Sequence, residues 1–191
     1  MKKALIIVDL QNDFCPGGSL AVSDGNTIIP IINRLMMDHK WDVVVATQDW
    51  HPSSHCSFVD KQGPWPAHCV QGSEGAELHT GLDKESISLI LRKGMDPKVD
   101  SYSAFQDNDK IRKTGLYGYL NELGVTDIYL TGIALDFCIK ATAIDANKMP
   151  GAHVHVITDL CAAVNYEGSL QNALDEMKAD GIKLITSKEI K

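Results

Sequence analysis

Short apolar runs alternate along the chain with longer amphipathic segments. Six runs have the length and continuous apolar character of buried strands: residues 4–8, 43–46, 87–91, 128–130, 154–157 and 183–185. Apolar residues recur at helical spacing in four of the intervening segments: 27–39, 111–123, 137–147 and 169–179. Gly124 and Gly181 stand where the C-terminal caps of two of these helices are expected. The pattern predicts an α/β fold with a mainly parallel sheet of about six strands covered on both faces, a doubly wound three-layer sandwich.

The stretch from Trp50 to about Ser86 interrupts this alternation. It is rich in Pro, His and Gly and has no sustained hydrophobic period. A connection of this length within a compact domain is usually functional. The whole chain of 191 residues has the size of one domain, so we expect a single domain over residues 1–191.

Composition and charge narrow the class of partner. The hydrophobic fraction of 44% and the charged fraction of 23% are ordinary for a globular protein, and the net charge of −7 argues against a nucleic-acid surface. No apolar stretch approaches the ~18 residues that a membrane span needs, and Met1 leads almost directly into a strand-like run. We therefore expect a cytoplasmic protein that binds small molecules and neither nucleic acid nor membrane. The sequence leaves the oligomeric state open, a homo-oligomer included.

Cysteine usage points to individual thiols. The five cysteines form an odd set without a CxxC pair, which is a poor disulfide framework: Cys15, Cys56, Cys69, Cys138 and Cys161.

The segment TGIALDFCIKA, residues 131–141, presents one of these thiols just after a strand-like run. Asp136 is a suitable N-cap for the helix that follows, which places Cys138 in the first helical turn. Unpaired N–H groups and the helix dipole there favour a thiolate, and hence a nucleophile. A small buried apolar side chain is the alternative, and the commoner case for a single cysteine.

Side chains that can take part in catalysis or metal binding follow several of the predicted strands. Asp9, Asp49 with His51, Lys93 and the turn that carries Cys138 each come directly after a strand. In open α/β sheets, ligands bind beyond the carboxyl ends of the strands, so these side chains are expected at one edge. A buried lysine needs an anionic partner, its charge lowers the pKa of a nearby thiol, and a buried carboxylate can accept the thiol proton. The alternative for Asp9 is an N-capping or loop-bonding aspartate, and the alternative for Lys93 is a surface lysine.

A second group of candidates begins at the same edge and continues into the long connection. Asp49, His51 and His68, with His55 nearby, offer a carboxylate and imidazoles, which suit Zn²⁺, Fe²⁺ or Mn²⁺ and leave coordination positions open. One alternative is a closed structural zinc site built from the pairs His55-Cys56 and His68-Cys69, which lack CxxC spacing. Ordinary loop histidines without any metal are the other alternative.

Three aromatic residues, Phe14, Trp65 and Tyr102, fall in loops that follow the strand ends. They could wall a flat apolar pocket, or they could be loop anchors that pack on the core.

Five motifs, taken in order, resemble one known family. They are IIVDLQNDFCPGGSLAV (6–22), DWHPSSHCSF (49–58), WPAHCVQGS (65–73), DSYSAF (100–105) and TGIALDFCIKATAIDA (131–146). Together they are similar to the nicotinamidases, also called pyrazinamidases, of the isochorismatase-like cysteine hydrolases. The similarity extends over nearly the whole chain, and part of the doubly wound expectation rests on it.

The resemblance implies hydrolysis of nicotinamide to nicotinate and ammonia in NAD salvage, with pyrazinamide and related carboxamides as further substrates. It implies Asp9, Lys93 and Cys138 as the catalytic triad. It also implies a non-proline cis peptide bond between Ile133 and Ala134, with the N–H groups of Ala134 and Cys138 as an oxyanion hole.

The resemblance further implies one divalent metal ion, zinc before iron or manganese, held by Asp49, His51 and His68. His55 stands as either a fourth ligand or a residue of the layer behind the ligands. Phe14, Trp65 and Tyr102 would then enclose the substrate ring.

Other functions remain in view at this level. Within the fold, an isochorismatase or a carbamoyl-amide hydrolase is the nearest alternative, although such relatives generally lack the metal ligands. A nucleotide-binding module of the same alternating pattern should carry a glycine-rich loop after the first strand, where this chain has Asp9. A redox protein that uses the odd thiols is a third reading.

Overall fold

The computed structural model describes residues 1–190, and its centre is one six-stranded sheet. The strands are β1 (Lys2–Val8), β2 (Val43–Asp49), β3 (Leu89–Lys93), β4 (Val125–Ile133), β5 (His153–Ala162) and β6 (Lys183–Ile185). They lie in the order β3-β2-β1-β4-β5-β6, and every neighbouring pair is parallel. The predicted parallel sheet of about six strands is confirmed, and the structure adds the strand order, which periodicity does not contain.

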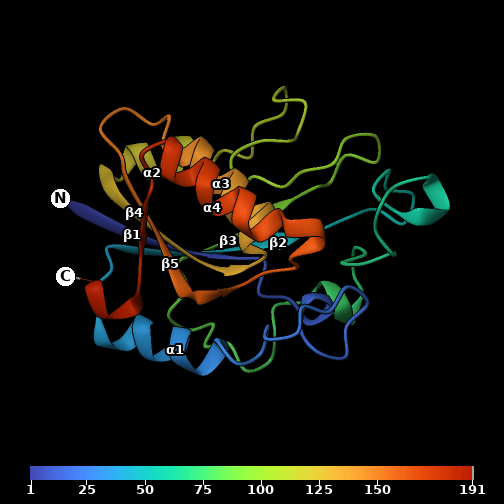
Figure 1. Cartoon of the computed structure of the whole chain (residues 1–191), viewed down its shortest axis with the longest axis horizontal. Helices are drawn as coiled ribbons and strands as arrows, with labels where there is room; N and C mark the ends of the chain where they lie inside the picture. Colours follow the sequence, from blue (N-terminus) through green and yellow to red (C-terminus); the bar gives the residue numbers. More distant parts are fainter. Residues whose placement is uncertain (191) are drawn as a thin grey trace.

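Helices cover both faces of this sheet (Figure 1). The helix α1 (Ile29–Asp38) lies on one face, and the other face carries α2 (Leu116–Glu122), α3 (Lys140–Ala146) and α4 (Ser169–Ala179). Alternate residues of β1 enter two separate apolar clusters: Leu5 and Ile7 belong to the cluster on the α1 side, and Ile6 to the cluster on the α2–α4 side. A strand buried on both faces must be apolar throughout, which explains the continuous apolar runs and confirms the three-layer sandwich.

The strand order creates a switch point at the carboxyl end of β1. The chain moves outward from β1 to β2 and β3 on one side, and from β4 to β6 on the other, so the connections after β1 and β4 diverge. A crevice forms at such a point. The loops that follow β1 and β2 gather beyond this edge (Figure 1), and the connection between β2 and β3 holds only the short 3₁₀ turns η2 (Val59–Lys61) and η3 (Glu74–Ala76).

Two predicted helices differ from the structure at their N-terminal ends. The segment 111–123 becomes helical only at Leu116, because residues 106–113 close a loop through an antiparallel bridge between Gln106 and Lys113. The segment 137–147 begins as a π-helical turn, η4 (Leu135–Ile139), and continues as α3. Gly124 and Gly181 follow α2 and α4 with φ of 71° and 81°, as expected for C-terminal caps.

The prediction that Asp136 is an N-cap is wrong. Ala134 occupies the cap position, and Asp136 lies inside the first turn with its carboxylate directed to the loop after β5. This carboxylate accepts hydrogen bonds from the N–H groups of Val164 (3.1 Å) and Asn165 (2.7 Å) and from the Ser169 hydroxyl. Asp136 therefore fixes the turn to a neighbouring loop, a contact between distant segments that local sequence does not show.

In the part of the chain that the structure describes, no helix has both the length and the apolar character needed to span a membrane.

Candidate active site

Lys93 lies at the centre of a buried cluster of charged groups. Its Nζ is 2.9 Å from Oδ2 of Asp9, 2.6 Å from Oδ1 of Asp49 and 3.5 Å from Sγ of Cys138. It also donates a hydrogen bond to the Ser101 carbonyl oxygen at 3.0 Å. Burial alone would lower the pKa of Lys93, but the two carboxylates raise it well above its ordinary value. Lys93 is therefore a buried ammonium, and the surface alternative for it is wrong.

Asp9 is held by its neighbours on β2 and β3. The Thr47 hydroxyl donates a hydrogen bond to Oδ1 of Asp9 at 2.6 Å and accepts one from its peptide N–H at 3.1 Å. Burial raises the pKa of Asp9 above its ordinary value, while the Lys93 ammonium acts in the opposite direction. A carboxylate with a raised pKa and a fixed orientation suits a group that accepts and returns a proton.

Cys138 lies in η4 and faces this carboxylate. The ligand-type atoms of Asp9, Asp49 and Cys138 all lie within 4.8 Å of one another. Burial raises the pKa of the Cys138 thiol well above its ordinary value, and the charge of Lys93 only partly offsets this effect. Burial and the two neighbouring carboxylates therefore oppose the expected tendency towards a thiolate, and Lys93, which pairs with both carboxylates, favours the thiolate only in part.

The peptide bond between Ile133 and Ala134, four residues before the cysteine, is cis.

Asp49, His51 and His68 form a second group beside the first. Their ligand atoms lie within 4.8 Å of one another, and all three side chains are buried. Nδ1 of His51 is 2.8 Å from the Gly94 carbonyl oxygen, and Nδ1 of His68 is 2.8 Å from that of Pro66. Because a carbonyl oxygen only accepts, each Nδ1 carries the proton, and each neutral ring keeps its lone pair at Nε2.

This arrangement fits a divalent cation. Nε2 of His51 lies 3.5 Å from Oδ2 of Asp49, so a lone pair faces a carboxylate oxygen unless a proton or a metal ion lies between them. Although burial would raise the pKa of Asp49, Lys93 and His51 lower it below its ordinary value. An ionised carboxylate and two imidazoles oriented from behind by carbonyl oxygens are a suitable donor set for zinc.

His55 is close to this group without completing it. Its ring stacks on that of His51 with centroids 3.9 Å apart, and its Nδ1 is 2.8 Å from the Ser57 hydroxyl. Among residues 1–190 its buried Nε2 has no hydrogen-bond partner, and His55 forms a separate group of ligand-type residues with His51 and Asp100. A buried nitrogen without a partner is costly, so this atom would gain from a hydrogen-bond donor or a metal ion. Whether it binds the metal stays a prediction.

The structure does not support the alternative of a closed zinc site with two cysteines. The groups of ligand-type atoms that come together among residues 1–190 contain neither Cys56 nor Cys69. Cys69 is fully buried, and its peptide N–H donates a hydrogen bond to Asp13 at 2.7 Å.

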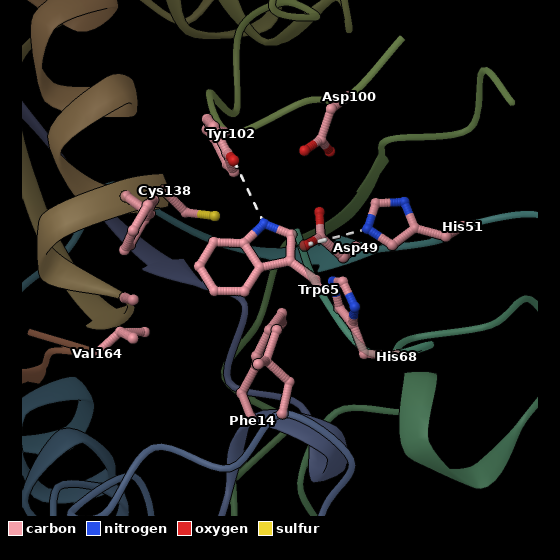
Figure 2. Close-up of a pocket in the computed structure, with 12 residues that line it drawn as sticks. Phe14, Asp49, His51, Trp65, His68, Asp100, Tyr102, Cys138 and Val164 are labelled. Carbon is pink, nitrogen blue, oxygen red and sulfur yellow. Dashed lines mark hydrogen bonds and ion pairs between the residues drawn. The ribbon is translucent and has the colours of Figure 1, made fainter. Parts of the chain in front are cut away.

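A cavity of about 430 Å³, including the space at its open mouth, joins the two groups. Its lining residues come from five loops and strand ends: Phe14, Leu20, Asp49, His51, Trp65, His68, Asp100, Tyr102, Ala134, Phe137, Cys138 and Val164. Figure 2 shows the Cys138 sulfur on one side of this cavity and the two histidines on the other. The predicted aromatic residues thus line one cavity, where the Trp65 indole N–H donates a weak hydrogen bond, 3.4 Å long, to the Tyr102 hydroxyl.

Sequence reasoning missed several residues of this region, among them Leu20 and Val164 of the cavity wall. Phe137 packs against Trp65 and Tyr102 with ring centroids 5.2 and 5.7 Å away, and its position beside Cys138 was an available signal. Asp100 lines the cavity, but it follows no predicted strand. Thr47 lies within β2 and looks like an ordinary strand residue, so nothing local marks its bond to Asp9.

Comparison with known proteins agrees with this geometry. The model of the isochorismatase domain matches residues 3–189. The chain belongs to the isochorismatase family.

Several relatives align with this chain over nearly its whole length. A nicotinamidase of Acinetobacter baylyi is 48% identical, with 98% of this chain and 94% of the relative aligned. A protein of L. infantum, solved in complex with nicotinate, is 44% identical, with a TM-score of 0.94 and coverage of 98% and 93%. The pyrazinamidase of Pyrococcus horikoshii, solved in complex with zinc, is 39% identical, with a TM-score of 0.84 and coverage of 97% and 99%. The resemblance to nicotinamidases and pyrazinamidases is thereby confirmed.

Proposed function

We propose that this protein is a nicotinamidase that hydrolyses nicotinamide to nicotinate and ammonia and also accepts pyrazinamide. One observation carries the proposal: Cys138, which belongs to a buried Asp-Lys-Cys cluster, lines the same aromatic cavity as an Asp-His-His group. The identity of 48% to a nicotinamidase and the nicotinate complex of a similar structure support it.

The cavity suits a flat heteroaromatic amide. Phe14, Trp65, Tyr102 and Phe137 present ring surfaces to a planar substrate, and the Cys138 sulfur lies at the wall where the carboxamide carbon would sit. When bound by Asp49, His51 and His68, a zinc ion would supply an open coordination position for the ring nitrogen.

The first half of the reaction uses Asp9 as the base. Asp9 accepts the proton of the Cys138 thiol, and the thiolate sulfur forms a bond to the amide carbon. The peptide N–H groups of Ala134 and Cys138 would hold the oxyanion. Asp9 then gives its proton to the amide nitrogen, the C–N bond breaks, ammonia leaves, and a thioester remains on Cys138.

The second half repeats the same proton path with water. Asp9 accepts a proton from the attacking water, the C–O bond forms, and the C–S bond of the thioester breaks. The departing sulfur recovers the proton from Asp9, which restores the thiol and releases the carboxylic acid; the acid then loses its proton to solvent and becomes nicotinate. Lys93 stays charged throughout, because Asp49 remains ionised beside it while Asp9 gains and returns a proton. The raised pKa of Asp9 suits this repeated transfer.

Ammonia release from nicotinamide tests this function. The purified protein is assayed as prepared, after removal of metal by a chelator, and after return of zinc. Release that falls on chelation and recovers with zinc is the expected result. No release from the zinc-loaded protein would contradict the proposal and favour another amide substrate of the same fold.

A further inference from the structure

The Gln11 side chain lies beside the end of β2, where β2 has no backbone partner on the β1 side. The pairing of β1 with β2 ends at Ile7 and Ala46, and β1 itself ends at Val8, whereas β2 continues to Asp49. The last residues of β2 therefore extend past their neighbour. A buried peptide N–H or C=O left without a partner is costly, so another group must satisfy this part of β2.

Gln11 satisfies it with one carboxamide. The peptide N–H of Asp49 donates to Oε1 of Gln11 at 2.8 Å, and Nε2 of Gln11 donates to the Asp49 carbonyl oxygen at 2.8 Å. Nε2 also donates to the Ala76 carbonyl oxygen at 2.7 Å. The side chain is fully buried, and all three bonds have the length of strong hydrogen bonds. The carboxamide thus replaces the missing strand on both sides of the Asp49 Cα.

We propose that Gln11 is a positioning residue that sets the metal affinity of the site by fixing the backbone of Asp49. The inference rests on the proposed role of Asp49 as a ligand. The Asp49 carboxylate must present Oδ1 to Lys93 while Oδ2 faces His51, and both contacts depend on where the Cα of Asp49 lies. Residues that hold a ligand from behind are commonly worth about 10- to 100-fold in metal affinity.

The chain offers a matched control in Gln48. It is the neighbour of Asp49, is 3% exposed, and donates through Nε2 to the same Ala76 carbonyl oxygen at 3.0 Å. The structure gives its side chain no bond to the Asp49 backbone. Gln48→Glu therefore adds the same charge at the same depth and loses the same contact to Ala76, without disturbing the backbone of the ligand.

Zinc affinity of the purified, metal-free protein, measured by competition with a chromophoric chelator, tests the inference. Gln11→Glu keeps the shape but loses both donated bonds, and Gln11→Met removes all three bonds without adding charge. We expect both to weaken zinc binding by at least about tenfold. Gln48→Glu should stay within about twofold of the wild type, and excess zinc should restore turnover in the Gln11 variants.

Unchanged zinc affinity in a folded Gln11 variant would overturn the inference, and so would an equal loss in Gln48→Glu. Failure of both Gln11 variants to fold, while the control folds, would replace it with a general structural role. No nicotinamide is needed for the affinity measurement, so its outcome is independent of whether the proposed reaction occurs. A wild-type protein that bound no zinc would overturn the ligand assignment together with this inference.

Discussion

Asp49 and Lys93 stand opposite each other in the parallel register of β2 and β3, and their side chains meet at 2.6 Å. One carboxylate oxygen of Asp49 therefore serves the ammonium, while the other faces His51 at 3.5 Å. The proposed metal group and the proposed catalytic group thus share a residue. Because Asp49 belongs to both groups, the role of the metal group and the role of the catalytic group are distinguished by comparing a variant that changes both groups with a variant that changes only one.

Replacement of Asp49 by Asn should affect both binding and chemistry. The variant loses the charge that a metal ion needs and one of the two carboxylates that stabilise Lys93, so zinc binding is lost, KM rises and kcat falls. His68→Ala removes a ligand that has no ion pair with Lys93, so we expect it to raise KM with a smaller effect on kcat. Zinc content and steady-state kinetics check this difference. Identical kinetics in the two variants would argue against the shared role of Asp49.

Replacement of Cys138 by Ala should abolish turnover while the metal stays bound. The thiol forms the covalent bond in the proposed reaction, so kcat should fall by at least about 1000-fold. Metal content by elemental analysis should equal that of the wild type. Cys161→Ala serves as the control because Cys161 lies on β5, is absent from the cavity lining, and donates a hydrogen bond through Sγ to the Ile157 carbonyl oxygen. Substantial turnover in Cys138→Ala would exclude this cysteine as the nucleophile.

Gly94→Ala should damage the metal group specifically. Gly94 has φ of 63°, and a Cβ there would lie 2.4 Å from Cε1 of His51, whose ring cannot retreat without losing its bond to the Gly94 carbonyl oxygen. Gly72→Ala is the matched control, with φ of 77° and no atom within 4 Å of the added Cβ.

Both substitutions place an alanine in a left-handed backbone conformation, which should lower the free energy of unfolding by about 1–2 kcal/mol. Only Gly94→Ala should also lose zinc affinity, as measured by chelator competition. Equal zinc affinity in the two variants would show that the His51 ring adapts.

Stability should fall on mild acidification through His155, which is not among the residues that line the cavity. Its ring stacks on Tyr129 with centroids 4.5 Å apart. Burial and the nearby charge of Lys183 lower the pKa of His155 below its ordinary value of 6.5, although Asp127 opposes them. Below pH 6.5, the unfolded chain therefore binds a proton that the folded protein binds less readily, and the folded state loses stability.

Urea unfolding of the wild type and His155→Phe at pH 7.5 and 5.5 measures this effect. Phe retains a ring for the stack and has no proton to bind. The stability of the wild type relative to the variant should decline toward the lower pH. Parallel changes in the two proteins would assign the acid sensitivity to other groups.

Much of the candidate site follows from one property of parallel sheets. Asp9, Asp49 and Lys93 each follow or end a strand. Because parallel strands present their carboxyl ends at one edge, the proximity of these three side chains can be predicted from the sequence. The hydrogen bonds of Gln11 to Asp49 and of Thr47 to Asp9 cannot be predicted in this way, because they depend on β2 extending past β1. The same limit explains Cys138: its position in the first turn is local, but its ionisation depends on burial among carboxylates from other strands.

The connection between β2 and β3 gives the metal group a second consequence. His51 and His68 are separated by 16 residues, and this interval contains Trp65 of the cavity wall. A metal ion bound by both histidines would act as a cross-link that closes this interval into a ring and reduces its conformational entropy. Zinc should then protect peptide bonds between residues 52 and 67 from proteolysis. In that case the ion would shape the entrance to the cavity as well as bind within it.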